Sequence, residues 1–560
     1  MKFSQMPYER VDFNKVEEEF TQLMKEFKEA RNGEEQFAVH RKYYELRDRV
    51  DTLMTIAHIR HDVNTADEFY SAEQDYYDEE SPRYSNMVIN YEKLLYESPY
   101  RNVLEDKIGL VAFKNMELSQ KSMQEKLIPL VQEENALTTA YEKIPASAEF
   151  DWDGEKVNIS RLKAYLKNPD RNVRRKAWEK FSAFFKAHEE ELDDIYDKLV
   201  KNRTKQAKEL GYENYVELGY YRMNRNCYTR EQVEAFRDQV KKDFVPFVEK
   251  LHDRRRQRLG LDKLSFIDEG VYFKEGNPNP VGTPEEILEA GQRMYGQLSP
   301  ETKEFFDFMM ENELFDVLGR NNKRVGGYMT YLPVYRSPFI FANFNGTSAD
   351  VDVITHECGH AFQGYLSGMD EIREHGDITM ETAECHSMSM EFFTEKWMDW
   401  FFGDKADAYR EMHFEDAMMF IPYGCMVDEF QHIVYANPDL TPAQRKEAWS
   451  RLEKEYKPHL DYEGDEFFGK GGYWQQQHHI YSFPFYYIDY VIAQTVAFEY
   501  KLWMDEDFEA AWKSYLKLCR LSAADFFNNM IKEVGLKLPF EEGCLKEMAG
   551  KLEKKLTKEA

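Results

Sequence analysis

Five consecutive residues, His356-Glu357-Cys358-Gly359-His360, form an HExxH motif. On a helix the two histidines lie one turn apart on the same face, so both imidazoles can reach one ion. Zinc accepts two imidazole nitrogens and a third protein ligand, and in catalytic sites it keeps one position open for water. The motif therefore predicts a hydrolytic zinc site, with His356 and His360 as ligands and Glu357 as the general base.

The helix that carries this motif has an apolar stripe on the side away from the two histidines. The stripe repeats at helical spacing and contains Val351, Ile354, Cys358, Ala361 and Tyr365. Such a stripe predicts that the helix packs against the core and offers the histidines on its other side. We therefore expect Cys358 to be a small core residue and not a ligand. Thr347 and Ser348 are candidates for the helix N-cap.

A third ligand should come from a second helix, and residues 380–393 combine helical spacing with carboxylates. Glu381 and Glu384 are both candidates. Glu384 shares a narrow helix face with Ser387 and Glu391, which follow it by three and seven residues. Periodicity therefore favours Glu384 modestly and leaves Glu381 as the alternative.

Helical spacing dominates the rest of the chain as well, both before residue 260 and after about residue 347. Loops are expected where this spacing is interrupted, at 81–82, 151–154 and 168–170. Aromatic and β-branched residues among Gly and Pro make 266–273 and 326–346 the strand candidates. The sequence therefore predicts a mainly α fold with a small β-sheet near the middle of the chain.

The strand candidate at 337–344 leads through an Asn-Gly pair into the helix of the HExxH motif. An exposed strand edge can pair with the backbone of an extended peptide of almost any sequence. We therefore expect this strand to contact a peptide substrate through Phe341, Ala342 and Asn343.

The composition indicates a globular protein, since 42% of the 560 residues are hydrophobic and 15% are aromatic. The formal net charge of −29 repels phosphate and anionic lipid, so we expect neither a nucleic-acid nor a membrane partner. This charge favours a soluble surface over the alternative, an acidic cleft that attracts cationic peptides. Six scattered cysteines and the lack of a long apolar run predict a cytoplasmic protein.

These motifs resemble those of the zinc oligopeptidases that include oligoendopeptidase F, Pz-peptidase and thimet oligopeptidase. HECGH is followed by the pattern E-x-x-S-x-x-x-E, here Glu384, Ser387 and Glu391. Three further segments are similar to segments of the family: NPDRNVRRKAWEKF at 168–181, AKELGYENY at 207–215 and HHIYSFPFYYIDY at 478–490. The resemblance covers most of the chain.

The resemblance implies a large helical zincin whose two helical lobes surround a deep substrate channel, with the small sheet near the active site. We expect an N-terminal helical lobe at about 1–190 and a catalytic region at about 191–560. In the family the first glutamate of the pattern is the third zinc ligand, which selects Glu384 over Glu381. We expect one zinc ion per chain.

The resemblance also implies that the segment at 478–490 supplies the groups that stabilise the oxyanion. His479, Tyr486 and Tyr490 are the residues expected in this role, and Tyr487 is both the alternative partner of Tyr490 and a candidate substrate contact. Tyr486 and Tyr490 lie one helical turn apart and can point into the same cavity.

The expected activity is hydrolysis of internal bonds in short oligopeptides, with Glu357 taking a proton from zinc-activated water. Glu391 or Asp352 is expected to orient a ligating histidine by accepting a hydrogen bond. Two alternatives stay open: a zinc carboxypeptidase or dipeptidase on a similar frame, and a peptide-binding protein without activity. Retention of the general base argues against the second alternative. The sequence predicts no oligomeric state.

Overall fold

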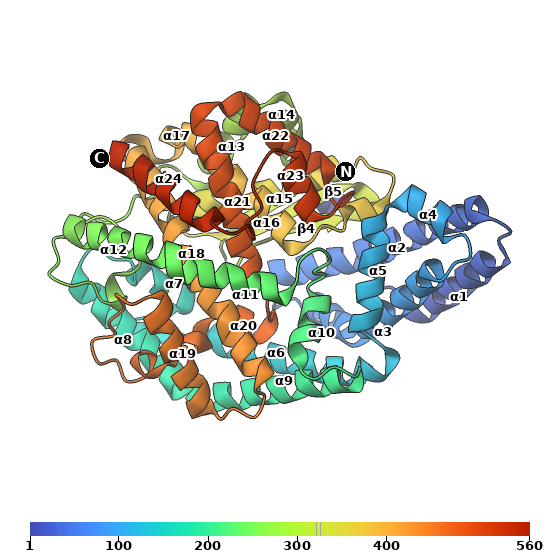
Figure 1. Cartoon of the computed structure of the whole chain (residues 1–560), viewed down its shortest axis with the longest axis horizontal. Helices are drawn as coiled ribbons and strands as arrows, with labels where there is room; N and C mark the ends of the chain where they lie inside the picture. Colours follow the sequence, from blue (N-terminus) through green and yellow to red (C-terminus); the bar gives the residue numbers. More distant parts are fainter. Residues whose placement is uncertain (321, 325, 560) are drawn as a thin grey trace.

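The computed structural model describes residues 1–320, 322–324 and 326–559 of the chain, and most of these residues are helical (Figure 1). The mainly α fold that the sequence predicts is confirmed. None of the helices within the described residues combines the length and apolar composition that crossing a bilayer needs.

The N-terminal helices extend to the right of the molecule in Figure 1. They are α1 (Phe13–Glu29), α2 (Gly33–Val63), α3 (Glu68–Tyr96), α4 (Arg101–Ile108) and α5 (Leu110–Ser122), followed by α6 (Ile128–Ala146). Helix α3 contains Pro82, so the loop expected at 81–82 is wrong. Proline removes one hydrogen bond, but α3 has 29 residues and packs against α1 and α2, and this packing maintains the helix.

The next segment begins with a β-hairpin and continues as helices. Its elements are β1 (Glu149–Trp152), β2 (Glu155–Asn158), α7 (Ile159–Tyr165), α8 (Arg171–Ala187), α9 (Glu189–Glu209), α10 (Tyr215–Arg222), α11 (Arg230–Gln239) and α12 (Val245–Leu259). The break expected at 151–154 is the hairpin turn, where Asp153 and Gly154 have positive φ. The loop expected at 168–170 is confirmed, and Asp170 caps α8 by accepting a hydrogen bond from the Asn172 amide.

A three-stranded sheet follows two further helices in the middle of the chain. These elements are α13 (Pro284–Leu298), α14 (Pro300–Glu311), β3 (Phe315–Leu318), β4 (Tyr328–Leu332) and β5 (Ser337–Phe344). Strand β5 is central, parallel to β3 and antiparallel to β4. The strand expected at 266–273 is wrong: this segment forms one 3₁₀ turn, Phe266–Asp268, in which Asp268 is buried against Arg171 and Arg174.

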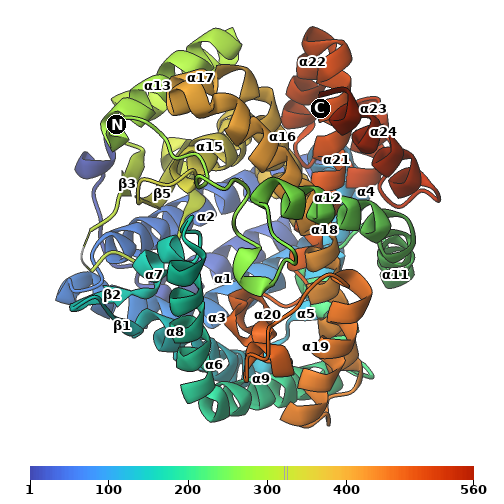
Figure 2. The ribbon, with the colours of Figure 1, turned by 90° about the vertical axis from the view of Figure 1, so that its left-hand side faces the viewer.

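The C-terminal helices complete the molecule. They are α15 (Ala349–Ser367), α16 (Met380–Phe393), α17 (Asp399–Phe402), α18 (Ala406–Ala436), α19 (Pro442–Tyr456), α20 (His478–Ser482), α21 (Tyr487–Glu506), α22 (Phe508–Leu521), α23 (Phe527–Glu533) and α24 (Cys544–Glu559). In Figures 1 and 2, α13, α17 and α22 lie at the top, whereas α6, α8, α9 and α19 lie at the bottom. Helix α16 packs against both α15 and α21.

Most buried apolar side chains of the described residues fall into two clusters. The smaller cluster extends from Val11 to Met116. The main cluster includes Met6, Ile56, Ile59 and most of the buried apolar residues from Tyr141 to Leu556, among them those of α15 and α16. The division of the chain into lobes at residue 190 stays a prediction.

Candidate metal centre

The helix of the HExxH motif begins after a tight turn at the end of β5. Gly346 has φ +80°, a conformation that glycine adopts without strain. The Asp350 carboxylate accepts hydrogen bonds from the amides of Asn345 and Gly346, both at 2.8 Å. Ser348 is at the N-cap, but its side chain makes no capping hydrogen bond, so Asp350 in the first turn holds the chain instead.

Helices α15 and α16 approach each other closely at Gly359, inside the motif. A Cβ atom at this position would lie 2.6 Å from the Ser387 Cα and 2.7 Å from the His386 carbonyl oxygen. Only glycine allows this approach. On the same helix Cys358 is completely buried, as its place in the apolar stripe predicts. The contact brings the helix of Glu384 to the histidine face of α15.

Two histidines and one glutamate converge at this crossing. His356, His360 and Glu384 offer potential ligand atoms that all lie within 4.8 Å of one another. The Oε2 atom of Glu384 is 3.3 Å from the Nε2 atom of His356 and 3.4 Å from that of His360. The two rings are nearly perpendicular, with an interplanar angle of 85° and centroids 5.0 Å apart. Two imidazole nitrogens and one carboxylate oxygen around a common point suit zinc.

The competing glutamate, Glu381, points elsewhere. It is buried and accepts a hydrogen bond from the Thr379 hydroxyl at 2.6 Å, with the Tyr228 hydroxyl 3.5 Å away. Glu384 instead accepts hydrogen bonds from Ser387 at 2.9 Å and from Tyr486 at 2.5 Å. Of the two candidates, the geometry places only Glu384 with the histidines.

Glu391 joins one of these histidines to a residue that sequence reasoning missed. Its carboxylate is 2.6 Å from the Nδ1 atom of His356 and 2.6 Å from the Nε2 atom of His413 on α18. Burial acts to raise the pKa of Glu391, but the two histidines outweigh it and lower this pKa to about 2. His413 lies on a different helix from the motif, so no spacing in the sequence connects the two.

Asp352, the other residue expected to orient a histidine, makes a different contact. It accepts a hydrogen bond from the Tyr409 hydroxyl at 2.6 Å, and burial raises its pKa to about 6. Of the two residues, only Glu391 contacts a histidine of the metal group, and its role in orienting that ring stays a prediction. Burial also raises the pKa of Glu357, which favours proton uptake by this carboxylate.

The C-terminal segment approaches the metal group from a third direction. His479 lies on α20, and its ring centroid is 5.9 Å from Tyr486, 5.9 Å from Tyr490 and 4.9 Å from Tyr487. The Gln477 amide nitrogen is 2.8 Å from the Nδ1 atom of His479. Because this amide donates, the assigned tautomer carries its proton on Nε2. Burial lowers the pKa of His479 to about 3, so the ring is a neutral donor.

Several of the predicted site residues, from four helices, line a cavity of about 300 Å³. It is lined by His356, Glu391, Asp352, His479, Tyr487 and Tyr490, among others. The structure therefore brings together residues from the HExxH motif, from the E-x-x-S-x-x-x-E pattern on α16 and from the segment at 478–490.

The predicted substrate edge on β5 is wrong. Both edges of this strand are occupied, by β3 on one side and β4 on the other. Phe341 and Ala342 are completely buried, and the Asn343 amide donates to the carbonyl oxygens of Arg324 and Gly326. The aromatic and β-branched pattern at 337–344 predicts a strand, but it does not show whether that strand is central or at the edge of its sheet. Within the described residues, β4 pairs on one side only and is an edge strand of this sheet.

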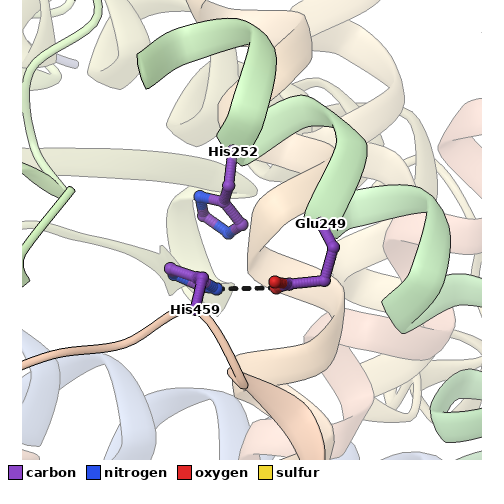
Figure 3. Close-up of side chains that lie close together, drawn as sticks. All are labelled: Glu249, His252 and His459. Atoms are coloured by element: carbon purple, nitrogen blue, oxygen red, sulfur yellow. Dashed lines mark hydrogen bonds and ion pairs between the residues drawn. The ribbon is translucent and has the colours of Figure 1, made fainter. Parts of the chain in front are cut away.

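A second group of potential ligands, Glu249, His252 and His459, lies on α12 and in the segment after α19 (Figure 3). The two rings are stacked, with centroids 3.5 Å apart and planes at 25°. An imidazole binds a metal in its own ring plane, so two stacked rings cannot both direct a lone pair at one ion. The Arg255 guanidinium, moreover, donates to the Nδ1 atom of His252 at 3.1 Å. This group is therefore an ion-pair cluster.

Comparisons with known proteins agree with the fold. The chain matches the family model of the peptidase M3 N-terminal domain over residues 3–123 and that of peptidase family M3 over residues 164–279 and 301–550. No curated protein matches it.

Solved structures of several related proteins are similar over the whole chain. Pz peptidase A with an inhibitor is 45% identical at a TM-score of 0.97, over 100% of this chain and 99% of that one. A candidate oligoendopeptidase F is 44% identical at a TM-score of 0.97, with the same coverage. A candidate oligoendopeptidase F from Bacillus anthracis is 40% identical at a TM-score of 0.92, over 100% and 98%. The chain therefore belongs to peptidase family M3 and is a metallopeptidase of the oligopeptidase type.

Proposed function

We propose that the chain is a zinc-dependent endopeptidase that cuts internal bonds of short oligopeptides, with one zinc ion held by His356, His360 and Glu384. The observation that carries this proposal is that the potential ligand atoms of these three residues lie within 4.8 Å of one another. The two imidazole rings are nearly perpendicular, and His356 lines a cavity of about 300 Å³. When bound, zinc supplies the Lewis acidity that makes a water molecule nucleophilic near neutral pH.

Two glutamates of the chain are proposed to transfer a proton and to orient a ligand. Glu357 accepts a proton from the attacking water and returns it to the departing amine. The raised pKa of this carboxyl supports both transfers. Glu391 accepts a hydrogen bond from the Nδ1 atom of His356, which leaves the Nε2 lone pair of this ring free to bind zinc.

The oxyanion is stabilised by donors on the C-terminal segment. His479 offers its Nε2 proton and Tyr490 its hydroxyl, both from the walls of the cavity. Tyr486 donates to Glu384 and therefore positions the ligand while it lies next to Tyr490, with ring centroids 4.8 Å apart. Tyr487 lines the same cavity and is proposed as a substrate contact.

The substrates are short because the site is proposed to lie in a channel between an N-terminal lobe, about 1–190, and a catalytic region, about 191–560. An unstructured peptide can enter such a channel and extend at small entropic cost, whereas a folded domain must first unfold. The edge strand β4 offers backbone groups for pairing with an extended peptide. The six cysteines form no disulfide and five are buried, which supports the cytoplasm as the protein's location.

The test is an internally quenched peptide with both ends blocked, followed by mass analysis of the products. We expect internal cleavage that a chelator abolishes and added zinc restores. The same peptide inserted in a rigid loop of a folded carrier should survive. If the blocked peptide stays intact while the same peptide with a free C-terminus loses residues from that end, or if only dipeptides are cut, the enzyme is instead a carboxypeptidase or dipeptidase. Efficient cleavage of the carrier would remove the channel from the proposal.

A further inference from the structure

The hydrogen bonds behind the metal group continue beyond Glu391. Each oxygen of this carboxylate contacts a different histidine: Oε1 lies 2.6 Å from the Nδ1 atom of His356, and Oε2 lies 2.6 Å from the Nε2 atom of His413 on α18. The terminal torsion of a glutamate is broad, so one hydrogen bond alone leaves the carboxylate free to turn. Two donors on different oxygens fix its plane, and with it the direction in which it holds His356.

The ring of His413 is itself held in place by two aromatic side chains. It is stacked on Tyr409 of the same helix, with centroids 5.7 Å apart and planes at 18°. It also meets Phe392 of α16 edge to face, at 5.3 Å and 69°. Close packing of this kind restricts rotation of a ring. The Nε2 atom of His413 therefore stays directed at Glu391.

The other nitrogen of His413 faces a second carboxylate. Its Nδ1 atom is 4.0 Å from the Oε1 atom of Glu395, which lies in the short 3₁₀ turn Glu395–Trp397 after α16. Within the described residues, neither of these two buried atoms has a hydrogen-bond partner. The Lys501 ammonium on α21 donates to the second oxygen of Glu395 at 2.5 Å, which favours the charged form of this carboxyl. Glu395 therefore places a negative charge opposite Nδ1.

Only a protonated imidazole suits this position between two carboxylates. Without a proton on Nε2, a lone pair of His413 would face Glu391, and without a proton on Nδ1, a lone pair would face Glu395. The geometry thus favours the imidazolium, which donates on both sides. Burial acts to lower the pKa of His413, but the hydrogen bond to Glu391 and the charges of Glu391, Asp352 and Glu395 outweigh it and raise this pKa to about 9.

We propose that His413 is a positioning residue of the metal centre, which fixes the carboxylate of Glu391 behind His356 and is in turn held by Glu395. The inference rests on the proposed zinc site, and it adds two residues that act on the ligand through Glu391. Without His413, the Glu391 carboxylate keeps a single donor and loses the cation that offsets its charge. It then holds His356 less firmly, and zinc affinity falls.

The experiment measures zinc affinity by chelator competition in the wild type and in two variants of His413. His413→Leu should weaken zinc binding by about 10- to 100-fold, the usual loss when a group behind a metal ligand is removed. His413→Gln should lose less, because its amide N–H can still donate to Glu391 without carrying a charge. Unchanged affinity in both variants would overturn the proposal. A wild type that binds no zinc would instead reject the proposed function.

His432→Leu is the matched control for the loss of a buried histidine. His432 is on the same helix, is 4% exposed, and contacts Asp428 at 3.3 Å and the Tyr220 hydroxyl at 3.0 Å. Its replacement should lower stability and leave zinc affinity at the wild-type value. Thermal unfolding of each zinc-free protein verifies that the variants are folded. An equal loss of zinc affinity in His432→Leu and His413→Leu would mean that the effect is one of general stability, and the proposal is then wrong.

A double-mutant cycle tests whether Glu395 acts through His413. Glu395→Gln should weaken zinc binding by about threefold to tenfold in the wild type, within the range of coupling between neighbouring groups. The same substitution should change nothing further in His413→Leu, because the group that Glu395 holds is then absent. If His413→Leu does not fold, His413→Gln takes its place in the cycle and the effect of Glu395→Gln should be smaller there than in the wild type. Equal effects in both backgrounds would overturn the part assigned to Glu395.

Discussion

Two groups of histidine and glutamate in this molecule contain the same kinds of ligand atom but differ in geometry. In the first, the rings of His356 and His360 are perpendicular, and Glu384 approaches both Nε2 atoms. In the second, the rings of His252 and His459 are stacked, and both nitrogens of His459 contact carboxylates, Glu249 at 2.7 Å and Glu269 at 2.9 Å.

The difference shows that orientation, and not composition, makes a metal site. A metal needs lone pairs that point at one position, which the one-turn spacing of the first group provides. Stacking instead suits a protonated imidazole held by two carboxylates beside a neutral one. Three elements meet at this second group: α12 carries Glu249 and His252, the loop after it carries Glu269, and the segment after α19 carries His459.

Substitutions in the two groups should differ most in their effect on the zinc content of the purified protein. The wild type should contain about one zinc per chain, Glu384→Ala should lose it, and Glu249→Ala should retain it, because only the first group has converging donors. Elemental analysis of the purified proteins after dialysis measures this content. Glu381→Ala is the matched control and should keep its zinc. A zinc content near two that drops to one in Glu249→Ala would show that the second group binds metal after all.

The next effect concerns the general base. Glu357→Gln should lower kcat by about 10²- to 10⁴-fold, because the amide cannot take up the proton of the attacking water. Its zinc content should remain that of the wild type, since Glu357 is not among the converging donors. Steady-state cleavage of the quenched peptide and zinc analysis on the same preparation test both statements. Near-normal turnover in this variant would reject the mechanism.

Substitutions of Tyr490 and Tyr486 should affect different properties of the enzyme, although the two rings lie side by side. Tyr490→Phe should lower kcat by about 10²- to 10³-fold, the usual loss for one oxyanion donor. Tyr486→Phe should mainly weaken zinc binding, because its hydroxyl donates to Glu384. Parallel measurements of kcat and of zinc affinity by competition with a chelator separate the two roles. Unchanged kinetics in Tyr490→Phe would transfer the donor role to Tyr487.

Replacement of the carboxylate behind His356 should have a smaller effect. Glu391→Gln should weaken zinc affinity by about 10- to 100-fold, because the amide holds the imidazole less firmly in the required tautomer. Chelator competition measures this change directly. Asp352→Asn serves as the comparison, since Asp352 contacts Tyr409 and no ligating histidine. Equal losses in the two variants would mean that both act only through the charge of the cavity.

Local features of the sequence predicted the part of the site that lies on single helices. The spacing of His356 and His360 and the face shared by Glu384 and Glu391 follow from helical periodicity alone. His413 could not be found in this way, because it reaches the cavity through the packing of α18.

The fold shows the same limit of local signals. Periodicity predicted the helices but failed at Pro82, where packing overrides a local helix breaker. The strand signal at 337–344 was right for β5, but no local pattern shows whether a strand is central or at an edge. The prediction that β5 pairs with substrate was wrong for this reason.

The smallest effect is expected in the second group, on stability and its dependence on pH. Burial acts to lower the pKa of His459, but Glu249 and Glu269 outweigh it and raise this pKa above the ordinary value of about 6.5. His252 stays neutral, because burial, followed by the nearby His459 and Arg255, lowers its pKa well below that value. The raised pKa means that the folded state binds the His459 proton more tightly than the unfolded state. Its contribution to stability is therefore complete below about pH 6.5 and is lost as the pH rises through the folded pKa.

His459→Gln should destabilise the protein by about 2 kcal/mol at pH 6, the order expected for hydrogen bonds to charged groups, and by less at pH 9. Calorimetric unfolding at both pH values, with zinc content verified to be equal, measures the difference between variant and wild type. His188→Gln is the control, because His188 pairs with Glu191 on the exposed surface and should contribute little at either pH. A difference that is constant or grows between pH 6 and pH 9 would show that His459 acts as a neutral ring. The stacked pair would then lack the charge that distinguishes it from the perpendicular pair at the metal centre.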